Sequence, residues 1–233
     1  MARIFALIPA RGGSKRVPRK NLLPLHGRPL VQWTVLFARQ TGLFDQVVIS
    51  TDDTEILEAA TQAGADAFGL RPGALSHDTA TSIDVALYEL ARAEAASGPY
   101  DYIAFLQPTS PFRKIQRWQD AVDLLDHNPE TPSVIGVAPV TVEPYHMFTL
   151  TDDQTVTPLF PDYLQKRTQD LPQTVAVNGS LYLVRCDVLK AQRSFFFPTS
   201  RAVLCVDPRE NIDIDTPLDF QMAQQILGSG PIN

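Results

Sequence analysis

Strand-length apolar runs, each followed by a helical pattern, constrain the fold of this chain more than any other feature. The runs lack apolar–polar alternation and lie at residues 4–9 (IFALIP), 46–50 (QVVIS) and 102–106 (YIAFL). Helical patterns follow them at residues 30–40, 53–63 and 117–127, and a shorter unit joins a strand at 66–69 to a helix at 81–96. Runs of this kind are typical of parallel strands that helices cover on both faces. The sequence therefore predicts an α/β fold with a doubly wound, mostly parallel sheet.

The second half of the chain interrupts this rhythm once. Residues 140–177 are rich in proline, threonine and aromatic residues, and TLTDDQT separates two short strand-like pieces. Regular elements then return as strands at 180–184 and 203–206 and a closing helix at 217–227. We interpret 140–177 as an arm inserted into one catalytic domain, which is formed by residues 1–139 and 178–233.

Two helix starts carry capping signals. Asp52 followed by Glu55 resembles a capping box, and Thr81 or Ser82 is suited to cap the helix that carries DVALYELARA.

The charge distribution restricts the possible partners. The formal net charge is −6, yet the first 44 residues contain eight Lys or Arg residues and no Asp or Glu. An acidic protein is poorly suited to nonspecific nucleic-acid binding, whereas a local basic loop suits a small polyanion. The opening apolar run ends at Pro9, too early for a secretory core or a membrane span. Two cysteines without a CxxC motif disfavour a zinc site and fit a cytoplasmic protein.

Unusual polar residues gather in the loops that follow the expected strands. Ligands of open parallel sheets bind outside the carboxyl ends of the strands. The loops at those ends are ARGGSKRVPRKN (10–21), STDD (50–53), LRPGALSHDTATS (70–82), LQPTSPFR (106–113) and NIDID (211–215). The candidate functional residues are therefore expected to converge on one edge.

The basic loop is the first candidate site. It matches neither the GxxxxGK[ST] phosphate-binding motif nor the GxGxxG dinucleotide motif, which disfavours kinases and dehydrogenases. Its glycine amides can approach phosphate oxygens, and Arg11, Lys15 and Lys20 could neutralise a triphosphate. The alternative is a solvated basic turn. The absence of nearby acids in the sequence favours the phosphate site.

A pair of acids near the end of the chain is the second candidate site. Asp213 and Asp215 are two residues apart, which in an extended segment places both carboxylates on one face, where they could hold magnesium. The alternative is helix capping by Asp215 or Thr216 ahead of Pro217, and we expect Asp219 to serve that structural purpose.

Histidines and aromatic residues give weaker signals. The four histidines show no ligand spacing. Tyr182 and the run Phe195, Phe196 and Phe197 could either pack a core or wall a sugar pocket, and core packing is the expectation.

Six segments together carry a family resemblance. IPARGGSKRVPRKN, VVISTDDTEI, RPGALSHDTATS, LQPTSPFR, NGSLYLV and NIDIDTPLDF, in this order, resemble the acylneuraminate cytidylyltransferases over about residues 3–227. The resemblance implies a Rossmann-like nucleotidyltransferase that joins CTP to a nine-carbon 2-keto sugar acid with magnesium and releases pyrophosphate. Rival classes are uridylyl- or guanylyltransferases acting on sugar phosphates, which are not expected to carry these motifs, and a non-catalytic nucleotide-binding module.

The resemblance also implies roles for individual residues. The residues expected in catalysis are Arg11, Lys15, Lys20, Asp213 and Asp215, the last two as magnesium ligands. Those expected to bind the nucleotide are Arg11, Gly12, Asn21, Arg71, Ala80 and Ser82. Those expected to bind the sugar are Gln107, Arg167, Asn178, Tyr182, Phe195 and Phe196.

The identity of the sugar is less constrained. Thr168 and Ala176 stand where members of the family carry arginines, so Arg167 is the expected carboxylate contact. N-acetylneuraminate is the first expected substrate, and legionaminate, pseudaminate and the eight-carbon acid Kdo are the alternatives.

The arm predicts an oligomer. It has no core of its own but carries apolar residues, namely Val140, Val142, Tyr145, Met147, Phe148, Leu150, Leu159 and Phe160. Such a surface is better explained by burial against a second subunit. The resemblance likewise implies a homodimer in which the arm reaches the partner's active site.

Overall fold

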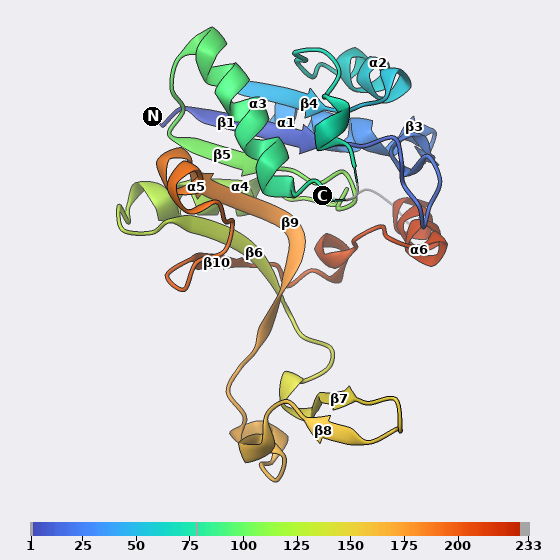
Figure 1. Ribbon diagram of the computed structural model, residues 1–233, viewed down its shortest axis with the longest axis vertical. Coiled ribbons are helices and arrows are strands. Elements are labelled where there is room, and N and C mark those ends of the chain that lie inside the picture. Colours follow the sequence, from blue (N-terminus) through green and yellow to red (C-terminus); the bar gives the residue numbers. More distant parts are fainter. Residues whose placement is uncertain (1, 78, 229–233) are drawn as a thin grey trace.

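A six-stranded sheet forms the centre of the protein, which a computed structural model describes over residues 2–77 and 79–228 (Figure 1). Residues 1 and 229–233, at the ends of the expected catalytic domain, and residue 78, in the expected nucleotide loop, lie outside this description. The strands are β1 (Ile4–Pro9), β4 (Gln46–Ser50), β5 (Tyr102–Phe105), β6 (Ser133–Pro139), β9 (Val175–Arg185) and β10 (Arg201–Leu204). Their order is β10-β6-β9-β5-β1-β4, and only β9 runs antiparallel to its neighbours. The prediction of a mostly parallel α/β sheet is confirmed.

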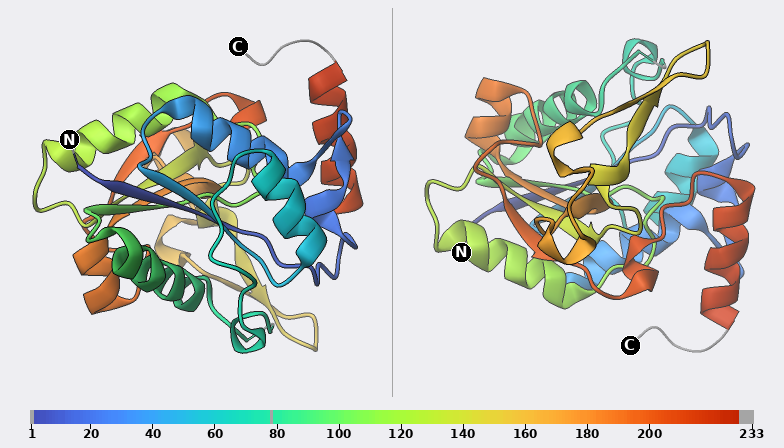
Figure 2. Two further views of the ribbon diagram at one scale, coloured as in Figure 1. Left: turned by 90° about the horizontal axis from the view of Figure 1, so that it is seen from above. Right: turned by 90° about the horizontal axis from the view of Figure 1, so that it is seen from below.

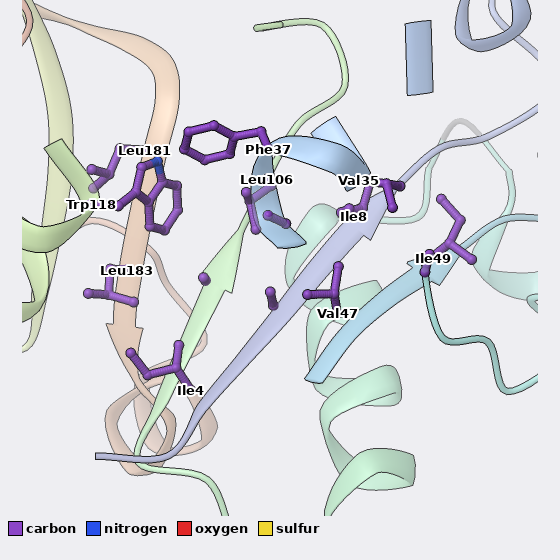
Figure 3. Close-up of a cluster of buried hydrophobic side chains, with 14 of the residues drawn as sticks. Ile4, Ile8, Val35, Phe37, Val47, Ile49, Leu106, Trp118, Leu181 and Leu183 are labelled. Atoms are coloured by element: carbon purple, nitrogen blue, oxygen red, sulfur yellow. The ribbon is translucent and has the colours of Figure 1, made fainter. Parts of the chain in front are cut away.

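Helices cover both faces of this sheet (Figure 2). They are α1 (Leu30–Thr41), α2 (Thr54–Gln62), α3 (Ser82–Ser97), α4 (Ile115–Asp126) and α5 (Cys186–Gln192), whereas α6 (Pro217–Gly228) lies apart from the sheet (Figure 1). One core contains apolar residues of α1, α2 and α4, with Trp118 and Phe37 near the strands (Figure 3). A second contains residues of α3 and α5, and a third, smaller one packs Ala223 of α6 against Leu25, Leu30, Phe112 and Ile214. Burial from both sides explains why the strand sequences do not alternate. No helix within the described residues is long and apolar enough to cross a membrane.

Two expectations about elements were wrong, and one strand was missed. The strand expected at 66–69 is a single parallel bridge between Val48 and Asp66. Strand β6, which is interrupted by Gly136, was not predicted at all. The cap of α2 is Asp53, whose carboxylate accepts from the backbone N–H groups of Glu55 and Ile56 at 2.9 and 3.2 Å. Asp52 therefore does not cap this helix.

Two other helix starts follow the sequence. The hydroxyl of Thr81 accepts from the N–H of Asp84, whose carboxylate in turn accepts from the N–H of Thr81, so α3 begins with a complete capping box. Thr216 and Asp219 form the same reciprocal pair at α6, which confirms the structural role expected of Asp219.

The arm stands on a two-stranded stalk. Strands β6 and β9 remain paired out to Pro139 and Val175, and the chain between them projects away from the sheet (Figure 1). It contains the hairpin of β7 (Phe148–Leu150) and β8 (Val156–Pro158). A short hairpin of β2 (Pro24–Leu25) and β3 (Arg28–Pro29) lies instead beside α1 and α6.

Gly136 permits an irregularity at the base of the stalk. The β6–β9 register shifts between Ile135 and Val137. A Cβ atom at Gly136 would lie 2.7 Å from Asn178 Oδ1 and 3.1 Å from Leu181 Cβ. That Asn178 oxygen accepts from the backbone N–H and the hydroxyl of Ser180 at 3.1 and 2.9 Å. Because Gly136 has no side chain, there is space for this part of β9.

We expect Gly136→Ala to lower the free energy of unfolding by about 1 to 3 kcal/mol, because the new methyl group would overlap buried atoms. Gly73→Ala is the matched control: a Cβ atom there would have no neighbouring atom within 4 Å and the φ of Gly73 is not positive, so its change should be small. Urea denaturation followed by circular dichroism measures both values. Equal stability of the two variants would contradict the packing argument.

Candidate functional site

A cavity of about 530 Å³ lies at the carboxyl ends of the central strands. Its walls come from the basic loop after β1, the segment before α3, the loop after β5 and Asp215. Of the residues singled out from the sequence, the cavity brings together Arg11, Lys15, Lys20, Asn21, Arg71, Ala80, Ser82, Gln107 and Asp215. The convergence expected from strand polarity is therefore observed.

The basic loop divides into residues that face the cavity and one that does not. Arg11, Lys15, Arg16 and Lys20 all line the cavity. Arg19 has a φ of 54° and directs its guanidinium to α2, with distances of 2.9 Å to Asp53 and 3.0 Å to Glu55. The contribution of Arg16 was missed, because charge alone does not show which side chains of an irregular loop point inward.

The acidic segment meets this loop at Asp215. Lys20 Nζ donates to Asp215 Oδ1 at 3.0 Å and to the carbonyl of Ile214 at 2.6 Å. Arg16 Nη1 donates to Asp215 Oδ2 at 3.0 Å. The side chain of Lys20 is only 12% exposed. Lys20 therefore links the basic loop to the acidic segment and also lines the cavity.

Asp213 lies outside the cavity wall. It is exposed, and it flanks the buried Ile214, whose N–H donates to the carbonyl of Thr109 at 2.8 Å. Burial raises the pKa of Tyr182, and the charge of Asp213 raises it further. Asp213 therefore lies on the side of the acidic segment that faces β9.

A magnesium site can be built from three or more protein side chains, or from one or two carboxylates that share the ion with the substrate. Only the second kind of site is compatible with the residues that the structure describes. Within the described residues there is no group of three or more His, Cys, Asp or Glu side chains arranged to hold a metal. Magnesium at nucleotide sites is commonly held by one or two carboxylates together with substrate phosphates and water. The half-exposed Asp215 on the cavity wall fits such a site once the exposed Arg16 releases its Oδ2, whereas Asp213 lies outside the wall.

The opposite wall of the cavity is built around Arg71. Its side chain is buried; its Nε donates to Ser76 Oγ at 3.3 Å and its backbone N–H donates to the carbonyl of Thr51 at 2.7 Å. Burial lowers the pKa of the guanidinium, while nearby carboxylates oppose that shift. Leu75, Val85 and Phe105 add apolar surface to the cavity. A cation beside apolar side chains is suited to a flat heterocycle with polar edges.

Gly12 and Asn21 support the loop by different contacts. The Gly12 N–H donates to Asp52 Oδ1 at 2.9 Å, so in this arrangement it is engaged by the protein. A Cβ at Gly12 would lie 2.8 Å from Asp53 Oδ2, which explains the glycine. Asn21 is buried and donates to the carbonyl of Arg11 at 3.0 Å.

Within a single subunit, the residues expected to bind the sugar do not lie together at the cavity. Gln107 lines the cavity, and Tyr182 and Phe195 pack behind its wall against Phe105, with ring centroids 6.4 and 5.0 Å away. Phe196 is 53% exposed, contrary to the core expectation. The other two lie elsewhere: Asn178 donates to Asn211 Oδ1 at 2.9 Å, and Arg167 pairs with Asp170 on the arm at 2.7 Å.

A buried arginine that the sequence analysis did not single out connects these parts. Arg113 donates to the carbonyl of Ser180 at 2.9 Å, to Thr34 Oγ1 at 3.1 Å and to the carbonyl of Gln107. Burial lowers its pKa to about 9, and the charge of Asp213 counters part of that shift. Its place at the end of LQPTSPFR, at a strand end, was the available signal.

Among the cysteines and histidines, only His77 lines the described part of the cavity. Burial raises the pKa of the Cys186 thiol to about 12 and also raises that of Cys205, so neither forms a thiolate readily at neutral pH. Both cysteines are free and buried. His77 lines the cavity wall, although its sequence context did not mark it.

Comparisons with known proteins agree with this geometry. A family model described as cytidylyltransferase matches residues 5–195. The chain is 34% identical to the CMP-N,N'-diacetyllegionaminic acid synthase of Legionella pneumophila, over 97% of this chain and 96% of that protein. It is 31% identical to the N-acylneuraminate cytidylyltransferase of Escherichia coli, over 95% of this chain and 51% of that longer protein.

A solved structure supports the fold independently. The CMP:2-keto-3-deoxy-manno-octonic acid synthetase complexed with CTP superposes with a TM-score of 0.73 at 20% identity, covering 98% of this chain and 99% of that one. The family match over most of the chain, together with the full-length relative, leads to one conclusion: this chain belongs to the cytidylyltransferase family.

Proposed function

We propose that the protein transfers CMP from CTP to a nonulosonic acid and releases pyrophosphate. The observation that carries this proposal is the cavity itself, in which a basic wall faces a second wall made of a buried arginine and apolar side chains. The first wall suits a triphosphate and the second a nucleobase. The sugar acids named for the two curated relatives support the acceptor class.

The geometry supports a role for several side chains in the proposed reaction. The anomeric hydroxyl of the sugar loses its proton to water and attacks the α-phosphorus, a new P–O bond forms, and the bond to the β-phosphate breaks with its electron pair going to pyrophosphate. Negative charge moves onto pyrophosphate, where Arg11, Lys15 and Arg16 are placed to stabilise it. Lys20 holds the acidic segment against the loop. Asn21 orients the Arg11 backbone, and Arg71, Ala80 and Ser82 bound the nucleoside.

We propose magnesium as the cofactor, held by Asp213 and Asp215. A bound magnesium ion would supply charge neutralisation for the phosphates and lower the pKa of the attacking hydroxyl. Arg16 and Lys20 both contact Asp215, and these contacts hold its carboxylate at the cavity edge.

For the acceptor, we rank N,N'-diacetyllegionaminic acid above N-acetylneuraminic acid. Identity to the first relative is 34%, against 31% to the second. The exposed Phe196 packs edge-on against Tyr182 with ring centroids 5.9 Å apart and offers an apolar surface for a second acetamido methyl group. This ranking reverses the order expected from the sequence alone.

Pyrophosphate release tests the reaction. CTP is the expected donor among the four common nucleoside triphosphates, and the acceptors to compare are diacetyllegionaminate, N-acetylneuraminate, pseudaminate and Kdo. We expect the nine-carbon acids to exceed Kdo in kcat/KM by at least about ten-fold, a difference of about 1.4 kcal/mol in transition-state stabilisation. Activity with UTP or GTP and a sugar phosphate would overturn the proposal.

Asp215→Asn should lower turnover by at least about 100-fold, because a lost anionic ligand removes stabilisation specific to the transition state. Asp213→Asn should also lose activity. Asp219→Asn is the control, since an amide oxygen can still accept the N–H of Thr216. The measurement is turnover as a function of magnesium concentration, with circular dichroism to confirm folding. Near-normal turnover of both variants would remove the metal assignment.

We also propose that the protein is a homodimer joined through the arm. Apolar side chains on the arm are exposed, among them Leu150 at 70%, Val156 at 57% and Phe148 at 46%. Arg167 can reach a cavity only if the arm of one subunit approaches its partner, so its role as the carboxylate contact depends on this dimer.

The free, buried cysteines support a reducing, cytoplasmic setting.

Light scattering should give twice the mass of one chain at micromolar concentration. The double variant Leu150→Asp, Val156→Asp should be a folded monomer, since these two residues face each other in the hairpin and burying four carboxylates per dimer is strongly unfavourable. Leu218→Asp on α6, with 63% exposure, is the matched control and should remain dimeric. A monomeric wild-type protein would refute the arm interface.

A further inference from the structure

Arg71 lies between carboxylates from two different elements. Asp52, after β4, places Oδ1 at 3.9 Å from Arg71 Nη2. Glu89, on α3, attracts the same guanidinium electrostatically from within the core and is only 1% exposed. Burial and the like charge of Arg11 both disfavour the charged form of Arg71. The two carboxylates counter part of these effects on the pKa of Arg71.

Asp52 connects Arg71 to the phosphate side of the cavity. The oxygen that faces Arg71 also accepts the Gly12 N–H at 2.9 Å. An acid beside a polyanion site weakens phosphate binding by charge repulsion. The presence of Asp52 is explained if its Oδ1 fixes the basic loop and Arg71 relative to each other.

Glu89 holds the segment before Arg71 through Arg92. Its Oε1 accepts from Ser50 Oγ at 2.8 Å, and its Oε2 accepts from Arg92 Nη1 at 3.3 Å. Arg92 donates in turn to the carbonyl of Phe68, three residues before Arg71. Burial raises the pKa of Glu89, and the Ser50 hydroxyl, Arg92 and Arg71 oppose that rise. The chain that carries Arg71 is thus anchored to both β4 and α3.

We propose that Asp52 and Glu89 are positioning residues that aim Arg71 at the nucleobase and so set the preference for cytosine over uracil. The inference rests on the proposed use of CTP. Cytosine presents two adjacent acceptors, O2 and N3, which a fixed guanidinium can satisfy together. Uracil carries a hydrogen on N3 and offers only one acceptor there, so discrimination requires a guanidinium that cannot turn away.

Calorimetric binding of CTP, UTP and inorganic pyrophosphate, without sugar, tests the proposal. Asp52→Asn and Glu89→Gln should each lower the ratio of CTP to UTP affinity by about ten-fold, the size expected for one impaired charged hydrogen bond. Pyrophosphate affinity should stay within about two-fold in Glu89→Gln, and should stay the same or rise in Asp52→Asn because an acid is removed. General structural damage would instead weaken all three ligands.

Two matched controls remove the same charge nearby. Asp53→Asn keeps an oxygen that can cap α2, and Glu94→Gln lies on α3 and pairs with Lys190 rather than Arg71. Both should retain the wild-type ratio. If Glu89→Gln does not fold, Ser50→Ala removes the hydroxyl that holds Glu89 without changing charge, and it should lower the ratio in the same direction.

A double-mutant cycle completes the test. In an Arg71→Ala background, Asp52→Asn should not change the CTP to UTP ratio further, because its effect acts through Arg71. An unchanged ratio in both single variants would overturn the positioning role while leaving the proposed function intact. A wild-type protein that binds UTP as tightly as CTP would also overturn the inference, whereas a wild-type protein that does not bind CTP would overturn the proposed function.

Discussion

Parallel hydrogen bonding of β1 to β4 and β5 is the constraint on which the rest of the structure depends. Because the three strands share one direction, the chain must leave each of them at the same edge. Loops distant in sequence are therefore forced together, and the cavity needs no further device to form. The surrounding helices exclude water from the strands, so polar side chains are concentrated where the strands end.

Much of this arrangement could be predicted from the sequence, because the relevant signals are local. Apolar runs identified β1, β4 and β5, and strand polarity placed Arg11, Arg71 and Gln107 at one edge. Strand β6 was missed because its glycine and flanking prolines weaken the pattern. The antiparallel direction of β9 was not predicted either, since an apolar run has the same composition in either direction.

Individual side-chain roles were harder to predict, for physical reasons. The cap of α2 fell on Asp53 because Asp52 is drawn to the Gly12 amide, a contact 40 residues away in sequence. Arg19 and Arg16 have the same charge and lie three residues apart, but backbone conformation sends them to opposite sides. Arg113 was invisible as a connector because its partners are mainly backbone carbonyls, which every residue possesses.

The stalk of β6 and β9 has a consequence for how such a protein can change over time. Pro139 and Val175 are direct partners across the two strands, so the chain leaves and re-enters the domain at neighbouring points. A segment attached in this way can be shortened, extended or exchanged with little effect on the register of the sheet. The arm and the cavity are thus free to diverge at different rates.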